Sequence, residues 1–315
     1  MLHTSRKSKG AKPRQTPEGK QVVGAPAISG YEFMKLLGSG GRSNVFLARQ
    51  SKSGRFVAIK VMRERWPRIS NADARFDHEI QLLKSLDHPN IIKVLDEGKT
   101  AQGIRFLVMP YIDGKSVLEF PYNGNLETLL RTFSKMCAAI HAANSRGIVH
   151  GDIKPGNLLV DSTGEPFVLD YGVARDWLEE LQCRDAPIGE VVTGSIAWAA
   201  PEQLSTGPRR FDARTDVYSL GLILYWAVAF NDPYDDDGSL RDILTSIVSR
   251  QPARLRDRLA VYDSLFAKRW PSTTEESVEV LDRIVQTALA KDPEKRYQTV
   301  EALRGDIHSL LLQAH

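Results

Sequence analysis

Cysteine is scarce in this sequence. Its 315 residues include only Cys137 and Cys183, which are not spaced as a metal-binding or redox pair. Cys137 falls among apolar residues on an expected helix, so neither cysteine indicates an oxidising compartment.

Long hydrophobic runs are missing as well, because the longest apolar stretch, residues 222–230, is far shorter than the roughly 20 residues that a membrane span needs. No charged start followed by an apolar run indicates a signal peptide. We therefore expect a soluble, cytoplasmic protein without a membrane partner.

The net charge is small once the N-terminal tail is set aside. The total is +3, but residues 1–30 hold 6 basic side chains against 1 acidic one, which leaves 36 basic and 38 acidic residues elsewhere. The near-neutral body argues against nucleic-acid binding. The tail mixes Ser, Lys, Gly, Pro and Gln without a period, so it cannot bury a face and is interpreted as a disordered basic leader. The 42% hydrophobic content is enough for packed cores.

The most informative stretch is residues 150–160, which reads HGDIKPGNLLV. Ten residues after it comes the triplet DYG at 170–172. Residues 158–160 and 167–169 are short apolar runs of the kind that form strands. Two short strands are therefore expected to present polar side chains at their ends.

These polar residues suit the transfer of a phosphoryl group. Asn157 and Asp170 carry hard oxygen ligands for a divalent cation such as magnesium. Asp152 is then free to accept a proton from an attacking hydroxyl, and Lys154 adds a fixed positive charge beside it. Chance is a poor explanation for finding all of these residue types at these positions.

A sheet is predicted before this stretch, from apolar runs rich in strand-forming residues. The predicted strands are residues 31–37, 44–50, 56–62, 90–95 and 104–109. A glycine-rich turn at 38–43 joins the first two, and its backbone amides could approach phosphate oxygens without side chains in the way.

Lys60 stands on an otherwise apolar strand, where an unpaired charge would be costly to bury. The segment 75–86 repeats apolar residues at helical spacing and carries Glu79 at the edge of that stripe. We therefore predict a Lys60–Glu79 ion pair.

Two helices are predicted further along the chain. Residues 126–146 predict an amphipathic helix that stops at Gly147. The helix that begins at Asp216 is apolar nearly all round, which predicts that it is buried.

Taken together, these residues resemble the catalytic loop and metal-binding triplet of eukaryotic-like protein kinases, in particular the bacterial Hanks-type serine/threonine group. The resemblance covers about residues 31–310. It implies an α+β bilobal fold. A small lobe at 31–110 would combine a mostly antiparallel sheet with one helix, and a larger helical lobe would follow at 111–315, after the tail at 1–30.

The same resemblance implies ATP and Mg²⁺ or Mn²⁺ as cofactors and assigns roles to individual residues. Catalysis would rest on Asp152, Lys154, Lys60 and Glu79, and metal binding on Asn157 and Asp170. The ATP site would include Gly38, Ser39, Gly40, Gly41, Arg42, Ser43, Val45, Ala58, Lys60, Met109, Pro110, Ile112 and Leu159. Structural or regulatory roles would fall to Tyr171, Gly172, Thr193, Ser195, Glu202, Asp216 and Arg296. Asp216 would tether the backbone of the catalytic loop, and Glu202 would pair with Arg296.

Several positions depart from the family pattern. Ser43 replaces the third glycine of the turn, and Tyr171 replaces the usual Phe, which adds a hydroxyl that needs a partner. Gly151 stands where most members have an Arg that receives a phosphate on the activation segment. Residues 171–192 contain no Ser or Thr, which leaves Thr193 and Ser195. The resemblance implies that Ser195 bridges to the catalytic Asp, so Thr193 is the only candidate switch. We therefore predict activity that does not depend on activation-segment phosphorylation.

The predicted function is ATP-dependent phosphorylation of Ser and Thr on protein substrates, with no nucleic-acid or membrane partner and with pairing of two copies through the small lobe left open. A catalytically inactive scaffold is one alternative, but such proteins usually lose Lys60, Asp152 or Asp170. A small-molecule kinase of the aminoglycoside phosphotransferase kind is another, and the motif at 200–202 speaks against it. Trp226 replaces a Glu found in kinases that prefer basic substrates, which argues against an Arg-directed site. The acidic run at 235–237 could still receive basic residues, although such a run after a proline turn is more often a solvated loop.

Overall fold

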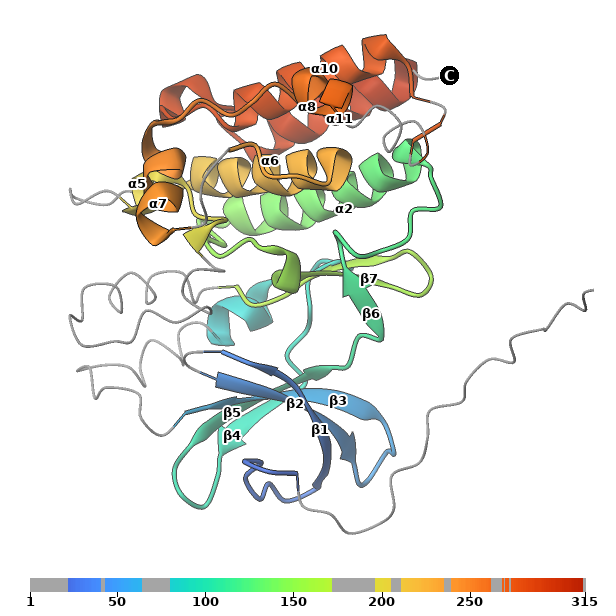
Figure 1. Ribbon diagram of the computed structural model, residues 1–315. Coiled ribbons are helices and arrows are strands. Elements are labelled where there is room, and N and C mark those ends of the chain that lie inside the picture. Colours follow the sequence, from blue (N-terminus) through green and yellow to red (C-terminus); the bar gives the residue numbers. More distant parts are fainter. Residues whose placement is uncertain are drawn as a thin grey trace, which may run out of the picture.

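The computed structural model describes residues 22–40, 43–63, 80–171, 196–204, 211–234, 239–261, 268, 270–271 and 273–313. Figure 1 shows two bodies, one built on a sheet and one built of helices, with a small second sheet between them. This arrangement is the bilobal α+β fold that the resemblance implies, so that prediction is confirmed.

The small lobe is a five-stranded antiparallel sheet with the strand order β1-β2-β3-β5-β4. Its strands are β1 (Tyr31–Ser39), β2 (Ser43–Gln50), β3 (Phe56–Met62), β4 (Asp96–Lys99) and β5 (Arg105–Pro110). Alternate side chains face one side of the sheet and close a core of their own. That core contains Phe46, Ala48, Val57, Ile59, Val61, Phe106 and Val108.

The predicted strand at 90–95 is wrong, because the fourth strand lies further along, at 96–99. Ile91 and Ile92 are apolar for another reason: both are buried in the core of the large lobe. The backbone there bonds to Val168, which donates to the Asn90 carbonyl at 2.8 Å and accepts from the Ile92 amide at 3.0 Å. This segment therefore fastens the small lobe to the large one.

The large lobe begins with a three-stranded sheet of order β6-β7-β8 and continues as helices. Its sheet consists of β6 (Gly114–Ser116), β7 (Leu158–Asp161) and β8 (Pro166–Val168). Its helices are α2 (Leu126–Asn144), α5 (Pro201–Leu204), α6 (Ala213–Ala229), α7 (Leu240–Ser249), α8 (Leu255–Val261), α10 (Glu275–Ala288) and α11 (Val300–Gln313), with 3-10 turns η1 (Pro155–Asn157) and η2 (Pro293–Lys295). Among the helices that the structure describes, none is both long and apolar enough to cross a membrane.

Helix α6 forms the centre of the large lobe, and it packs against α2, α10 and α11. It begins where the Asp212 side chain accepts a hydrogen bond from the Arg214 amide, a standard N-cap contact. Its neighbours come very close: a Cβ added at Gly221 would lie 2.7 Å from the Ala288 Cβ. The predicted burial of this helix is confirmed.

Helix α2 delivers the chain to the predicted catalytic loop at 150–157. Asn125 caps its start by accepting from the Thr128 amide, and buried residues such as Phe133 and Met136 line its inner face. Past its end the backbone turns at Gly147 with a φ of +75°, a conformation that favours glycine. The predicted helix and its glycine stop are confirmed, with the helix ending two residues earlier than expected.

The predicted Glu202–Arg296 ion pair is present and holds α5 against the segment before α11. Arg296 Nη1 and Nη2 donate to the two Glu202 carboxylate oxygens at 2.8 Å each. Its remaining hydrogen bonds go to backbone carbonyls of Ala290, Arg214 and Lys291. The Arg296 side chain is fully buried and that of Glu202 is 17% exposed, so removal of one partner would leave a buried charge without its counterion.

We expect Glu202→Gln to lower the free energy of unfolding by about 3–5 kcal/mol, the range for breaking a buried pair, in chemical denaturation. The matched control is Glu301→Gln, which breaks the exposed Glu301–Arg304 pair on α11 and should change the free energy by about 0–1 kcal/mol. Equal losses in the two variants would contradict the structural role of the buried pair.

Candidate active site

The catalytic loop, residues 150–157, is held from below by one buried carboxylate of α6. Asp216 Oδ1 accepts from the Gly151 amide at 2.7 Å, and Oδ2 accepts from the His150 amide at 2.9 Å and from Asn144 Nδ2 at 2.8 Å. Burial raises the pKa of Asp216, although His150 and these donors act in the opposite direction. The contact that the sequence predicts for Asp216 is therefore present, with Asn144 as a partner that was not predicted.

A second tether of the loop was missed entirely. Gln203 is buried, donates through Nε2 to the Gly151 carbonyl at 2.8 Å and accepts from the Ala200 amide at 2.8 Å. Gly151 has a φ of +67°, so its backbone is in a left-handed conformation. No sequence spacing links positions 151 and 203, but a glutamine directly after the Pro201-Glu202 pair was the signal available.

Three polar side chains of the loop meet one another. Lys154 Nζ lies 2.8 Å from Asp152 Oδ2, and Asn157 Nδ2 donates to the same oxygen at 3.1 Å and to the Asp152 carbonyl at 2.8 Å. Within the described part of the chain, the other carboxylate oxygen of Asp152, Oδ1, has no hydrogen-bond partner. It is therefore the oxygen that can accept a proton from a bound hydroxyl.

The pairing of β7 with β8 brings Asp170 beside this group. Leu158 is paired with Val168 across the two strands, and the Leu169 amide donates to the Asn157 carbonyl at 2.9 Å. Asp170 follows directly with a φ of +55°, which is uncommon for a residue other than glycine. The two predicted metal ligands therefore stand at adjacent strand ends, as the spacing of the motifs indicated.

The oxygens of this pair fit a hard cation. Asn157 makes its contacts to Asp152 through its amide nitrogen, which leaves Oδ1 as the end that can bind a metal. Asp170 adds a carboxylate. Two protein ligands are enough for Mg²⁺, because this ion usually keeps water and phosphate oxygens in its shell.

Lys60 joins the two lobes at this point. Its Nζ lies 3.0 Å from Asp170 Oδ1, and only 8% of its side chain is exposed. Burial raises the pKa of Asp170, but the Lys60 charge and hydrogen bond outweigh it and hold that pKa below its ordinary value. The predicted partner Glu79 lies outside the described residues, as do Gly41, Arg42, Gly172, Thr193 and Ser195.

His150 and Tyr171 support the loop from the core. The His150 ring nitrogen Nε2 lies 2.9 Å from the Leu169 carbonyl, and the ring packs against Tyr171 with centroids 4.7 Å apart. The Tyr171 hydroxyl donates to the Ala139 carbonyl on α2 at 3.3 Å. The extra hydroxyl thus has the partner that the sequence indicated it would need, and burial raises its pKa.

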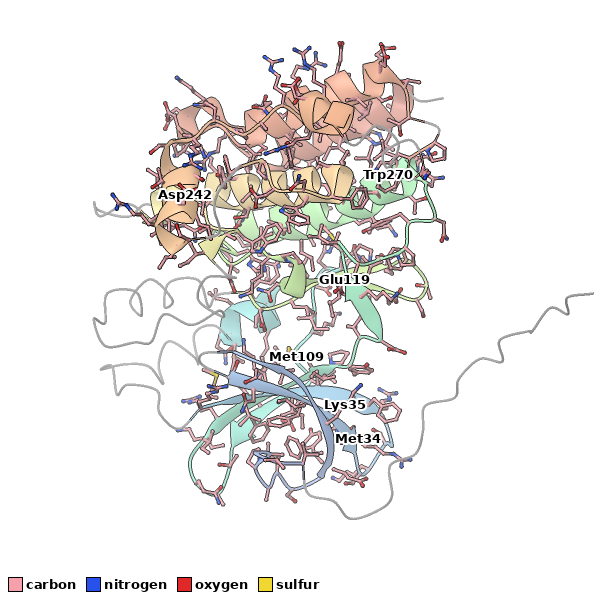
Figure 2. All side chains as sticks on the ribbon, viewed as in Figure 1. Met34, Lys35, Met109, Glu119, Asp242 and Trp270 are labelled. Carbon is pink, nitrogen blue, oxygen red and sulfur yellow. The ribbon has the colours of Figure 1, made fainter. Side chains whose placement is uncertain are left out.

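The predicted purine-binding residues share one face of the small sheet and the floor opposite it. Ala58 and Lys60 are on the same face of β3, with Met109 of β5 opposite Ala58 and Val45 of β2 opposite Lys60. Met109 lies where the small lobe meets the large one (Figure 2). Val45, Ala58 and Leu159 are only half-buried. Pro110 ends β5, and Ile112 follows it and packs on the large-lobe core.

The glycine-rich turn is held by hydrogen bonds that were not predicted. Gly40 closes the turn by donating to the Ser43 carbonyl at 2.9 Å. Arg63, directly after β3, donates to Ser39 Oγ at 2.5 Å and to Asn44 Oδ1 at 3.1 Å, and those two side chains bond to each other at 3.0 Å. One cation thereby holds both strands that flank the turn. An arginine three residues after Lys60 was the sequence signal.

With this geometry established, comparison with known proteins identifies what the chain resembles. Residues 31–306 match the model of the protein kinase domain. The chain is 32% identical over 292 residues to the serine/threonine-protein kinase PrkC of Bacillus subtilis, a match that covers 92% of this chain and 41% of PrkC. It is also 32% identical over 284 residues to PknB of Mycobacterium leprae, covering 88% and 42%. The chain thus spans about two fifths of the length of these relatives.

A solved structure supports the fold. The crystal structure of the Mycobacterium tuberculosis PknI kinase domain aligns with a TM-score of 0.60 and 23% sequence identity, covering 90% of this chain and 97% of that domain. At this identity the likeness concerns the fold alone.

We expect Lys60→Met to raise the pKa of Asp170, because burial would then act without the lysine charge. In the native protein the lowered pKa means that the carboxylate stabilises the fold above its unfolded-state pKa, and that this contribution is lost as pH falls through the folded-state pKa. The change is measured by NMR titration of ¹³C-labelled aspartate. Lys84→Met, which breaks the exposed pair with Glu97, is the control and should leave the Asp170 titration unchanged. An Asp170 titration that is the same in Lys60→Met would contradict the assignment.

Proposed function

The chain belongs to the protein kinase family, and we therefore propose that it transfers the γ-phosphoryl group of ATP to serine and threonine hydroxyls of proteins. The observation that carries this proposal is the convergence of Asp152, Asn157 and the Lys60–Asp170 pair on one site between the lobes. The relatives that are named serine/threonine-protein kinases support the choice of acceptor.

Asp152 is proposed as the group that orients the acceptor hydroxyl and takes its proton. Its Oδ2 atom is held by Lys154 and Asn157, so the carboxylate is fixed with Oδ1 available to the substrate. Lys154 remains close enough to stabilise negative charge that develops during the transfer. A carboxylate fixed in this way supplies the orientation that phosphoryl transfer requires.

Asn157 and Asp170 are proposed to hold Mg²⁺ or Mn²⁺. A bound divalent cation would neutralise charge on the phosphates. Lys60 has two tasks in this proposal: it keeps the Asp170 carboxylate ionised, and it presents a buried positive charge to the phosphates below the glycine-rich turn. Arg63 would hold that turn in place through Ser39 and Asn44.

The backbone around Gly151 supports activity without phosphorylation of the activation segment. In the family, an Arg at this position receives a phosphate. Here the Gly151 amide binds Asp216 and its carbonyl binds Gln203. Because both backbone groups already have buried partners, the loop has no need of a phosphate to fix its position.

A cytoplasmic location, which follows from the composition, stays a proposal beside the main one. Pairing of two copies through the small lobe is left open. The alternatives of an inactive scaffold and a small-molecule kinase are separated from the main proposal by the experiment below.

We expect Asp152→Asn to lower kcat for phosphorylation of a generic basic protein by about 10²–10⁴, the usual contribution of a general base. Nucleotide affinity should change little, because Asp152 is on the substrate side of the site. The measurement is transfer of label from ATP in the presence of magnesium. Asp87→Asn, on an exposed surface residue, is the charge-matched control. Label that is independent of Asp152 would leave only the scaffold, and label on aminoglycosides alone would favour the small-molecule kinase.

We also expect phosphatase-treated protein and the Thr193→Ala variant to phosphorylate substrate at the rate of the untreated protein. The reason is that the catalytic loop is held by Asp216 and Gln203 rather than by a phosphate. Intact-mass spectrometry confirms the phosphate-free state before the initial rates are measured. An enzyme that is inert until Thr193 is modified would refute this expectation.

A further inference from the structure

Beyond its first two residues, helix α6 reaches the surface at one position. From Thr215 to Ala229 every residue is buried except Trp226, which is half-buried. A helix that is covered on all sides and opens only at a tryptophan presents an apolar ring to its surroundings. The position needs a reason, since an arginine or glutamate could reach solvent there at lower cost.

A second half-buried tryptophan lies against the first. The rings of Trp198 and Trp226 are 6.3 Å apart between centroids and tilted by 50°, a geometry within the range of favourable aromatic pairs. The Trp198 backbone is fixed to α6 because its carbonyl accepts from Ser219 Oγ at 2.9 Å. Each ring therefore covers only part of the other, and the pair remains half-buried.

The pair is connected to the catalytic loop at both of its elements. Trp198 precedes Gln203, which binds the Gly151 carbonyl, and Trp226 is on the helix whose Asp216 binds the Gly151 amide. Ten residues of helix separate Asp216 from Trp226, or about 15 Å at 1.5 Å per residue. An extended peptide covers about 3.3 Å per residue, so this length of helix corresponds to roughly five substrate residues.

No carboxylate on these two elements is available to a basic side chain. Among the described residues 196–204 and α6, the acidic residues are Glu202 and Asp216. Glu202 is bonded to Arg296, and Asp216 is bonded to the loop backbone and Asn144. What the two elements offer to a substrate is therefore aromatic surface.

We propose that Trp198 and Trp226 form an apolar subsite that takes a hydrophobic side chain, such as Leu, Met or Phe, within about five residues of the Ser or Thr that is phosphorylated. The proposal rests on the proposed kinase function and names the substrate class of that same site. Burial of an apolar side chain between the rings would favour such substrates through binding, which lowers KM more than it changes kcat.

The test is a set of peptides with one serine acceptor in an alanine background. Leu is moved through each position from five residues before the serine to five after it, and a matched set carries Arg instead. With the wild-type protein we expect Leu to raise kcat/KM about tenfold over Ala at one or two positions, the size expected for one partly buried apolar side chain. Asp152→Asn supplies the background rate.

Substitutions of Trp226 test whether the preference for Leu depends on the tryptophan pair. Trp226→Phe should keep most of the preference for Leu, whereas Trp226→Glu should bring the Leu-to-Ala ratio to about one and favour Arg at the same position. The matched control is Phe230→Glu, on an exposed aromatic residue at the end of α6 that stacks on Trp270, and it should keep the ratio of the wild type. Thermal unfolding establishes that each variant is folded. The peptide profile of the wild-type protein tests the proposal even where a variant does not fold.

Two outcomes would overturn the subsite. One is a wild-type profile that is flat or that favours Arg over Leu at every position. A profile that favours Arg would indicate recognition by cation–π contact or by acidic residues. The other is a preference for Leu that survives in folded Trp226→Glu. If the wild type phosphorylates none of the peptides and no protein substrate, the proposed kinase function fails, and this result is distinct from active enzyme with a flat profile.

Discussion

The Asp216 carboxylate lies at the centre of the large lobe, where it accepts hydrogen bonds from the amides of His150 and Gly151 and from the Asn144 side chain. Because α6 is buried almost all round, this carboxylate is attached to a helix that lies inside the core of the lobe. The catalytic loop therefore takes its position from the core of the lobe, and a buried charge satisfied by three donors is costly to displace.

From this anchor the site is assembled outward by short steps. Asp152 follows directly after Gly151, and η1 with the pairing of β7 and β8 brings Asn157 next to the strand end that carries Asp170. Lys60 of the small lobe then reaches Asp170. The proposed chemistry thus depends on contact between the two lobes, whereas Asp152, the proposed base, and the residues that hold it belong to the large lobe alone. A shift of the small lobe would alter the nucleotide side of the site without disturbing Asp152.

Local patterns explain why much of this could be predicted from the sequence. The strand Phe56–Met62, the helix α2 with its glycine stop, and the polar ends of β7 and β8 depend on neighbours within a few residues. The prediction of a strand at 90–95 failed because the apolar residues there are buried against the large lobe. An apolar pattern predicts that residues are buried, but it does not show which core they join. Gln203 and Arg63 were missed since their partners are distant in the chain.

The sequence by itself determined which residues carry oxygen ligands, a base and a buried lysine, and it placed them on strands and loops, because spacing along the chain sets which side chains share a strand end. Only the tertiary structure decided that Lys60 meets Asp170 and that Trp198 packs against Trp226. Lys60 is 110 residues from Asp170 and Trp198 is 28 residues from Trp226, yet each pair is in contact. Such contacts arise from the packing of whole elements, which no local pattern encodes.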